Sequence, residues 1–273
     1  MKRNAFAGIV LSVFIIGSFS GCGKQTDPDV LMREAKANAG ELTSCTASIE
    51  NTLEFTVDGQ QKHYQTENNV TYQAKPFALK SVQAAKLDQT DSNSTTYNLS
   101  DTQGIWFYSQ SDGVWQKTSA GSLDTTPFHQ IDILRLLEHV KGQKYVREVN
   151  LGAGKAHKLE LTFKSEVLRS TVENIVTATG IGNGSSTIVQ ALLDSADDIY
   201  GYCYIDEKTG QIAQLELDAT QALNKVFQNI DGSSVKIIVT KCMISGKIDN
   251  IGTAPAVKLP AEAANAQTVE AHG

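Results

Sequence analysis

The chain has 273 residues, 41% of them hydrophobic, and a formal net charge of −6. This length and composition are enough for one large domain or two small ones with a real core, which excludes a wholly disordered chain. The acidic balance argues against a nucleic-acid partner and against charge-driven binding to a broad anionic-lipid surface.

The first 21 residues have the pattern of a secretory signal. Lys2 and Arg3 form a short positive region, and residues 5–17 (AFAGIVLSVFIIG) form an apolar segment of the expected length. A transmembrane helix needs about 20 apolar residues, and no such run follows. We therefore predict a signal peptide over residues 1–21 and no membrane-spanning segment.

The segment FSGC, residues 19–22, resembles the bacterial lipobox, although Phe19 stands where Leu is usual. The resemblance implies that a diacylglycerol alkylates the Cys22 thiol and that the chain is cut before it. Each buried acyl methylene contributes about 0.8 kcal/mol, so two chains such as palmitate anchor stably where one is marginal. We expect a lipid-anchored protein on the extracytoplasmic face of the cell membrane, with a tether over residues 22–28; a plain secreted protein is the alternative.

After cleavage the chain would carry 22 Lys and Arg against 30 Asp and Glu, a net charge of −8. Three cysteines would remain besides Cys22, namely Cys45, Cys203 and Cys242. Their spacing selects none of the three possible disulfide pairings and matches no CxxC or zinc pattern. We expect two or three buried thiols rather than a catalytic one.

The first half of the chain reads as a helix followed by strands. Asp27 and Pro28 are typical of a helix start, which predicts a helix over residues 29–42. Alternating apolar and polar residues then predict strands, and residues 88–104 read as a polar connection at a hairpin tip, with residues 95–99 either in the connection or in a strand. The predicted strands are 46–59, 61–74, 76–87 and an aromatic hairpin over 104–118.

The second half mixes strands with inserted helices. Apolar residues at helical spacing predict a helix over 126–140 and two amphipathic helices within 165–198, separated by a break at the glycine-rich segment 180–184. A short helix is expected at 219–227, and the tail from residue 261 is expected to be disordered. The predicted strands are 144–151, 156–164, a hairpin over 199–218, and 233–245.

About ten strands joined mostly by short turns, with helices inserted, describe a single α+β domain over residues 29–260. An antiparallel sheet of this size must curl or close. Because one face of most strands is apolar, the sheet needs cover on one side only, and the inserted helices supply it. We predict a curled antiparallel β half-barrel covered by helices.

These pieces together resemble extracytoplasmic lipoproteins with the LolA/LppX-like fold, and in particular lipoproteins of Gram-positive bacteria that share it. The segment YIDEKTGQI, residues 204–212, carries the resemblance most strongly, with the aromatic hairpin GIWFYSQSDGVWQK. The resemblance implies an open half-barrel whose concave side, lined by apolar side chains, holds acyl chains. It also implies carriage of lipids or lipoproteins, or sensing of the envelope, without catalysis.

No motif in the sequence indicates an enzyme, a metal site or a cofactor. The five histidines are scattered, no GxSxG elbow is present, and the paired acids Asp197 and Asp198 read as solvated caps. Residues 180–186 (GIGNGSS) lack the Lys of a phosphate loop and follow a helix, so a helix break is the better interpretation.

One strand leaves its orientation open. Tyr200, Tyr202 and Tyr204 share one face of it, and residues 199, 201, 203 and 205 share the other. The tyrosines either clamp a ligand in the concavity or form a surface band.

The leading hypothesis is a non-enzymatic lipoprotein that binds a hydrophobic or amphipathic ligand, a lipid or an acylated peptide, in the half-barrel. The alternative is an envelope sensor or accessory subunit that uses the fold for protein contacts. Helices 165–198 are either a permanent plug or a moving lid. The residues predicted to line the cavity are Leu53, Phe55, Leu161, Phe163, Leu192, Leu193, Leu215 and Leu217.

Overall fold

In the computed structural model, the structure describes residues 27–269 except 112, 153, 182–184 and 229–235. The predicted signal peptide and Cys22 therefore lie outside the described residues, and the division of the chain at Cys22 stays a prediction. Among the described residues, no helix is long and apolar enough to span a membrane.

The described residues contain one curled sheet of twelve strands in the order β12-β6-β5-β4-β3-β2-β1-β11-β10-β9-β8-β7. Every pairing is antiparallel except the short parallel contact of β12 with β6. The strands are β1 (Ser44–Val57), β2 (Gln60–Gln73), β3 (Ala78–Leu87), β4 (Thr90–Asp101), β5 (Gly104–Ser111), β6 (Val114–Ser119), β7 (Val140–Leu151), β8 (Gly154–Phe163), β9 (Ile199–Asp206), β10 (Ile212–Asp218), β11 (Ile237–Asp249) and β12 (Gln267–Thr268).

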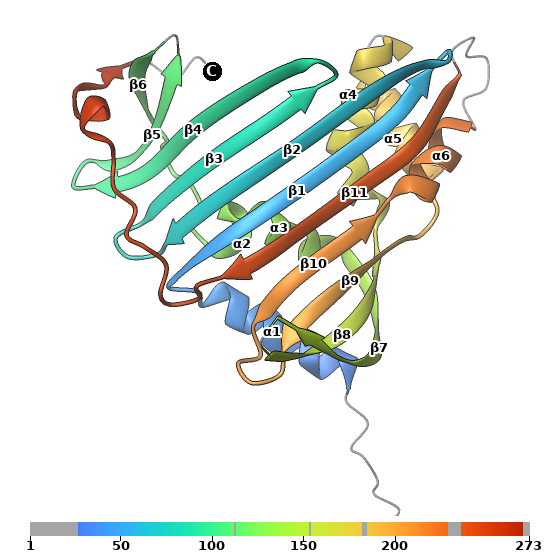
Figure 1. The fold of residues 1–273 in the computed structure, drawn as a ribbon, viewed down its shortest axis with the longest axis horizontal. Coiled ribbons are helices and arrows are strands. Elements are labelled where there is room, and N and C mark those ends of the chain that lie inside the picture. The colour runs from blue at the N-terminus through green and yellow to red at the C-terminus, as the bar shows by residue number, and fades with distance from the viewer. Residues whose placement is uncertain (1–26, 112, 153, 182–184, 229–235, 270–273) are drawn as a thin grey trace, which may run out of the picture.

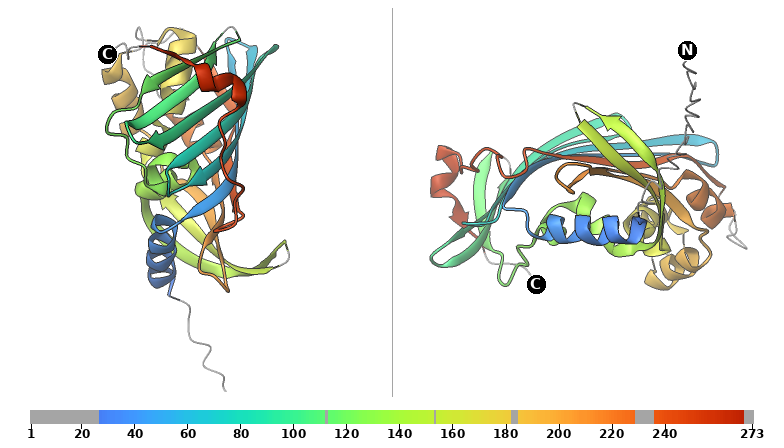
Figure 2. Two further views of the ribbon diagram at one scale, coloured as in Figure 1. Left: turned by 90° about the vertical axis from the view of Figure 1, so that its left-hand side faces the viewer. Right: turned by 90° about the horizontal axis from the view of Figure 1, so that it is seen from below.

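The sheet does not close, because β7 and β12 end it on opposite sides. The larger helices lie under the concave side of the arch that the sheet forms (Figure 1; Figure 2). The predicted curled half-barrel covered by helices is confirmed. The helical segments are α1 (Pro28–Gly40), α2 (Pro127–Gln130), α3 (Asp132–Arg135), η1 (Leu136–His139), η2 (Ser165–Leu168), α4 (Arg169–Thr179), α5 (Ser186–Asp194), α6 (Thr220–Gln228) and η4 (Ala261–Asn265).

Helix α1 starts where the sequence predicts and is tied to two other parts of the fold. The Asp27 carboxylate caps it by accepting a hydrogen bond from the Asp29 backbone N–H at 2.9 Å. Lys36 Nζ donates to the Leu137 carbonyl at 2.8 Å, and Asn38 Nδ2 donates to the Gly210 carbonyl at 3.1 Å. The helix therefore joins the segment after β6 to the β9–β10 turn across the concave side.

The β9–β10 turn, which carries most of the sequence resemblance, is organised by Asp206. Its Oδ1 atom accepts hydrogen bonds from the backbone N–H and the hydroxyl of Thr209, both at 2.8 Å. The hydrogen bond from the Thr209 hydroxyl is the main reason that the pKa of Asp206 lies below its usual value. Gly210 closes the turn with a φ of +65°, a conformation that favours glycine.

The single helix predicted over 126–140 is wrong: the segment forms α2, α3 and η1, with an extended residue, Ile131, between α2 and α3. Ile131 is 0% exposed and Ile133 is 1% exposed. In one regular helix these two residues would point in nearly opposite directions, so only a broken helix buries both.

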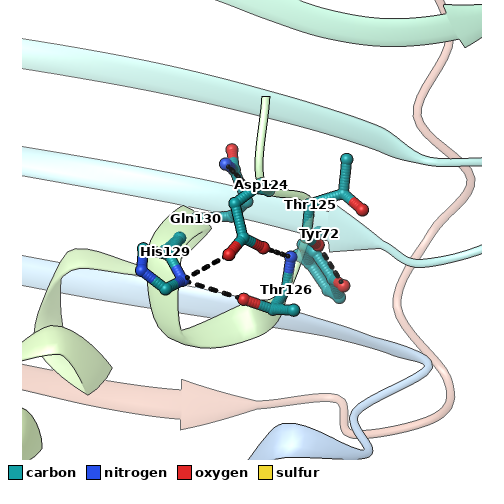
Figure 3. A network of polar contacts seen from close by, with 6 residues as sticks. All are labelled: Tyr72, Asp124, Thr125, Thr126, His129 and Gln130. Atoms are coloured by element: carbon teal, nitrogen blue, oxygen red, sulfur yellow. Dashed lines mark hydrogen bonds and ion pairs between the residues drawn. The ribbon is translucent and has the colours of Figure 1, made fainter. Parts of the chain in front are cut away.

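A polar network fixes the start of this segment (Figure 3). The Asp124 carboxylate accepts from the Thr126 backbone N–H at 2.9 Å and lies 3.1 Å from His129 Nδ1. The Tyr72 hydroxyl of β2 donates to the Thr125 carbonyl at 3.0 Å. The short helices are thereby held under the centre of the sheet.

Two further predictions differ from the structure. Residues 88–104, expected to be a polar connection, contain the whole of β4, which pairs with β3 from Ala78↔Leu99 to Leu87↔Thr90. In the tail expected to be disordered from Ala261, the described residues 261–269 contain η4 and β12, and Ala263 is fully buried, while residues 270–273 lie outside the described residues. In both segments backbone pairing with a neighbouring strand orders residues whose side-chain hydrophobicity does not predict a strand.

We predict that Gly201→Ala lowers the free energy of unfolding by about 1–3 kcal/mol, as measured by urea denaturation. A Cβ at this position of β9 would lie 2.2 Å from the Glu216 backbone oxygen of the neighbouring strand β10. The control is Gly142→Ala, whose Cβ would meet nothing closer than Thr162 Cβ at 4.0 Å. Equal losses in the two variants would contradict the close approach of β9 to β10.

Candidate functional site

The concave face of the sheet carries an apolar layer built by strict alternation. In β8, Leu159, Leu161 and Phe163 are at most 1% exposed, while Glu160 and Thr162 between them are half-buried on the opposite face. This is the two-residue period of a strand that buries one face. The same layer continues across β9, β10, β11 and β1.

The structure brings all eight predicted cavity residues into this one apolar cluster. Seven of them are buried and Leu53 is half-buried; the seven are Phe55, Leu161, Phe163, Leu192, Leu193, Leu215 and Leu217. Helical segments pack against them, so these side chains lie in a filled core. Their role in binding a ligand stays a prediction.

Helices α4 and α5 form one wall of this filled space, and we call them, with η2, the lid. Their buried side chains are all apolar: Leu168, Val172, Ile175, Val176, Val189, Leu192 and Leu193. A hydrogen bond from Arg169 Nη2 to Gln190 Oε1 at 2.6 Å joins the two helices to each other. The predicted pair of amphipathic helices is confirmed, although residues 182–184 of the break between them lie outside the described residues.

The lid is held to the sheet by apolar contact. Leaving Tyr145 aside, no hydrogen bond or ion pair between described residues joins α4 or α5 to a strand. In the segment that joins α5 to β9, Asp197 pairs with Lys225 of α6 and Asp198 pairs with Lys141 of β7. All four side chains are 41% exposed or more, and exposed pairs of this kind contribute about 0–1 kcal/mol each. Few polar contacts therefore oppose movement of the lid.

Beside this layer, part of the concave face carries uncharged polar side chains. Beyond Val70, the concave side of β2 continues with Asn68 and Thr66, and Ser81 of β3 faces the same way. Ser81 Oγ donates to Asn68 Oδ1 at 2.7 Å, and Asn51 Nδ2 donates to Thr66 Oγ1 at 3.1 Å. The concave face thus has an apolar region that helices cover and, beside it on β1, β2 and β3, a patch of hydroxyl and amide groups.

The tyrosine row of β9 lies on the convex surface, which settles the orientation of that strand. Tyr200 is 53% exposed, while Ile199, Cys203 and Ile205 are buried in the core. The Lys158 ammonium lies 3.6 Å from the Tyr202 ring centroid. The surface-band interpretation is therefore confirmed, and the tyrosines do not clamp a ligand in the concavity.

Two cavities open on other surfaces. One of about 790 Å³ lies where residues 196–198 and α6 meet β9 and β10, with Tyr200, Glu216 and Asp218 in its wall. Another of about 580 Å³ lies over β1, β2 and β3, with Ser48, Asn69 and Lys80 in its wall. Of the predicted cavity residues, only Leu217 lines either of them. Neither cavity is the apolar one that the sequence predicts.

Cys45, Cys203 and Cys242 are free and buried, as expected. Burial raises the pKa of each thiol to about 12. Such thiols remain protonated and act as small apolar side chains of the core. Within the described part of the chain, no three His, Cys, Asp or Glu side chains are grouped so that they could hold a metal ion.

No protein-family model and no curated protein matches the sequence. The similar solved structures include LprF from Mycobacterium bovis, which is 12% identical with a TM-score of 0.44 over 85% of this chain and 96% of that one. The lipoprotein LppX from Mycobacterium tuberculosis is 11% identical with a TM-score of 0.44 over 85% of this chain and 100% of that one. A third is MucB in complex with MucA, 12% identical with a TM-score of 0.29 over 86% of this chain and 61% of that one.

The predicted resemblance to LolA/LppX-like lipoproteins is confirmed in that such proteins are among the similar structures. At this level of identity the likeness concerns the fold and says nothing about ligand or partner. The Gram-positive origin stays a prediction.

We predict that stability falls as the pH rises from about 9 towards 12. The thiols of the unfolded chain ionise near pH 9, whereas the buried thiols resist ionisation up to about 12. The stability from each protonated thiol is therefore fully present below pH 9 and is lost above it, by about 2 kcal/mol at pH 10.5. Urea unfolding at pH 7.5 and 10.5 measures the loss.

The matched variant is Cys203→Ala, which lacks one of these buried thiols. It should lose about 2 kcal/mol less than the unaltered chain between the two pH values. An identical loss in both proteins would contradict the burial of Cys203 as a protonated thiol.

Proposed function

We propose that this chain is an extracytoplasmic lipoprotein, anchored through diacylglycerol on Cys22, that binds a hydrophobic or amphipathic ligand. The ligand, a lipid or an acylated peptide, inserts between the concave face of the sheet and the lid. The protein carries or presents this ligand and catalyses no reaction.

One observation carries the proposal: an apolar layer on a curved sheet is covered by two helices that almost no polar contact ties to the strands. A guest that replaces the lid must offer apolar surface in return, and it has few hydrogen bonds to break. An acyl chain meets this requirement, whereas a charged metabolite does not.

The free energy of burying the lid side chains and that of burying an acyl chain are of the same order. Helices α4 and α5 together bury six apolar side chains, which stabilise the closed state by about 9–18 kcal/mol at about 1.5–3 kcal/mol each. A sixteen-carbon acyl chain gains about 12 kcal/mol from burial of its methylenes. For an acyl chain taken from water, burial in the site can therefore offset exposure of the lid side chains.

The tether between the proposed anchor at Cys22 and the first helix is short. Helix α1 begins at Pro28, so a tether of only a few residues separates it from Cys22. A lipid-bearing Cys22 would hold the half-barrel close to the membrane that contains its ligand.

We predict that Leu193→Ala in α5 speeds uptake of a pyrene-labelled dodecanoic acid about tenfold in stopped-flow fluorescence. The substitution costs about 2–5 kcal/mol of packing and weakens the lid specifically. The control is Leu223→Ala in α6, which removes an equally buried leucine outside the lid and should leave the uptake rate unchanged.

The unaltered protein should bind the same probe saturably, and native mass spectrometry should show lipid that co-purifies from cells. Equal uptake rates for both variants would show that the lid does not gate the site. If the protein takes up no probe and purifies empty, the helices are a permanent plug and the sensor or accessory-subunit hypothesis is favoured.

We predict that Cys22→Ser abolishes incorporation of radioactive palmitate and moves the protein from the membrane fraction to the medium or periplasm. The reason is that no other position offers the acylated thiol of the lipobox. Cys45→Ser is the control, since its thiol is buried and should not affect labelling. Persistent labelling of the Cys22 variant would refute the anchor.

A further inference from the structure

The C-terminal segment after β11 docks far from the strand that it follows. In the sheet, β11 and β6 are separated by the five strands β1, β2, β3, β4 and β5. Residues 250–269, which we call the arm, run past the ends of the intervening strands and reach the outer edge of β6 (Figure 1; Figure 2). The arm therefore adds a strand, β12, at the edge of the sheet formed by β6, which is distant from the arm in the sequence.

Few contacts hold the arm to the body. At its root, the Gly252 backbone N–H donates to the Ser44 carbonyl at 2.8 Å. At its far end, β12 pairs with β6, and the Val269 backbone N–H donates to the Lys117 carbonyl at 2.9 Å. Between these points, the backbone hydrogen bonds of the described residues stay within the arm. Its far end can thus detach without disturbing the sheet.

Ala263 of η4 is the anchor of the far end. It is 0% exposed, η4 lies against β6, and the residue is not part of the main core. Its neighbour Ala264 is exposed. The arm therefore docks through one small buried side chain and a short stretch of strand pairing.

The β6 edge does not need the arm in order to stay formed. Strand β6 pairs with β5 along its whole length, from Trp106↔Ser119 to Ser111↔Val114. On one face, Trp115 packs against Tyr97 with ring centroids 5.9 Å apart, and the Lys117 ammonium lies 4.9 Å from the Trp106 ring. When the arm leaves, an ordered strand with unpaired backbone groups remains, which is the usual acceptor for an added strand.

We propose that the β6 edge is a strand-acceptor site and that its second occupant is the arm of another copy of this chain, so that two copies exchange arms. The arm fits this edge by construction, because it occupies it here. The ten residues 253–262 reach roughly 33–36 Å when extended, far enough to bridge to an adjacent molecule. A long connection with a small docked end is the arrangement that permits such exchange at low cost.

The acceptor is tested with the full chain in detergent, a variant lacking residues 261–273, and a fluorescent peptide of residues 253–273. The shortened variant should bind the peptide one to one by fluorescence anisotropy. The intact chain should bind it at least about tenfold more weakly, because its own arm competes at an effective concentration in the millimolar range. Equal binding by the two proteins, or none by the shortened one, overturns the acceptor site.

Two matched peptide pairs test the mode of docking. Ala263→Arg should abolish binding while Ala264→Arg should not, because only Ala263 is buried. Val269→Pro removes the backbone N–H that donates a hydrogen bond to the Lys117 carbonyl, so it should weaken binding more than Val269→Ala. If the two peptides of each pair bind with the same affinity, the proposed docking is overturned. Should the shortened variant fail to fold, full-length Ala263→Arg, whose arm is displaced, serves as the acceptor.

Exchange between copies is tested by mixing the shortened variant with a differently tagged intact chain. At protein concentrations approaching the millimolar range, where docking on another copy can compete with docking on the chain's own edge, light scattering should give the mass of one copy of each. Intact chain with Ala263→Arg should not form this pair. Absence of the pair when the peptide binds, or its persistence with Ala263→Arg, contradicts exchange between copies.

Discussion

The burial of one face of a curved twelve-stranded sheet is the constraint on which the rest of this structure depends. Alternation along β8–β11 and β1 places an apolar layer on the concave side, and such a layer must be covered. The chain meets this demand with inserted segments: α1, the broken run α2–α3–η1, and the lid. The proposed site for an apolar guest lies under the lid, because the surface that the lid covers is apolar.

The strands that bury one face could be predicted from sequence, since their alternation records their environment. The fold class and the burial of the cysteines follow in the same way, whereas the alternation of β9 left open which of its faces is buried, and only the structure places the tyrosines on the convex surface. Strand β4 could not be predicted so easily, because Ser, Thr and Asn lie along both its faces and only pairing with β3 orders it. The break at Ile131 could not be predicted for another reason: it allows burial of Ile131 and Ile133, which would point in nearly opposite directions in a regular helix.

The candidate site was predicted in part. The eight apolar residues do meet in space, because residues two apart on a strand share a face. Sequence periodicity could not say whether an open cavity or packed helices would face them, since both demand the same apolar pattern. Nor did the periodicity predict the patch of polar side chains around Asn68 and Ser81 on the concave face, because its residues read as an ordinary polar face.

The central claim is that the lid moves while the sheet stays intact, and hydrogen–deuterium exchange with lipid vesicles present and absent tests it most directly. Without lipid, the amides of α4 and α5 should exchange far faster than those of β8 and β9, since the helices can open locally. With lipid, exchange of the helix amides should change while that of the strand amides stays the same. If α4 and α5 exchange only as fast as the core strands, with or without lipid, the helices are a fixed plug and the account is contradicted.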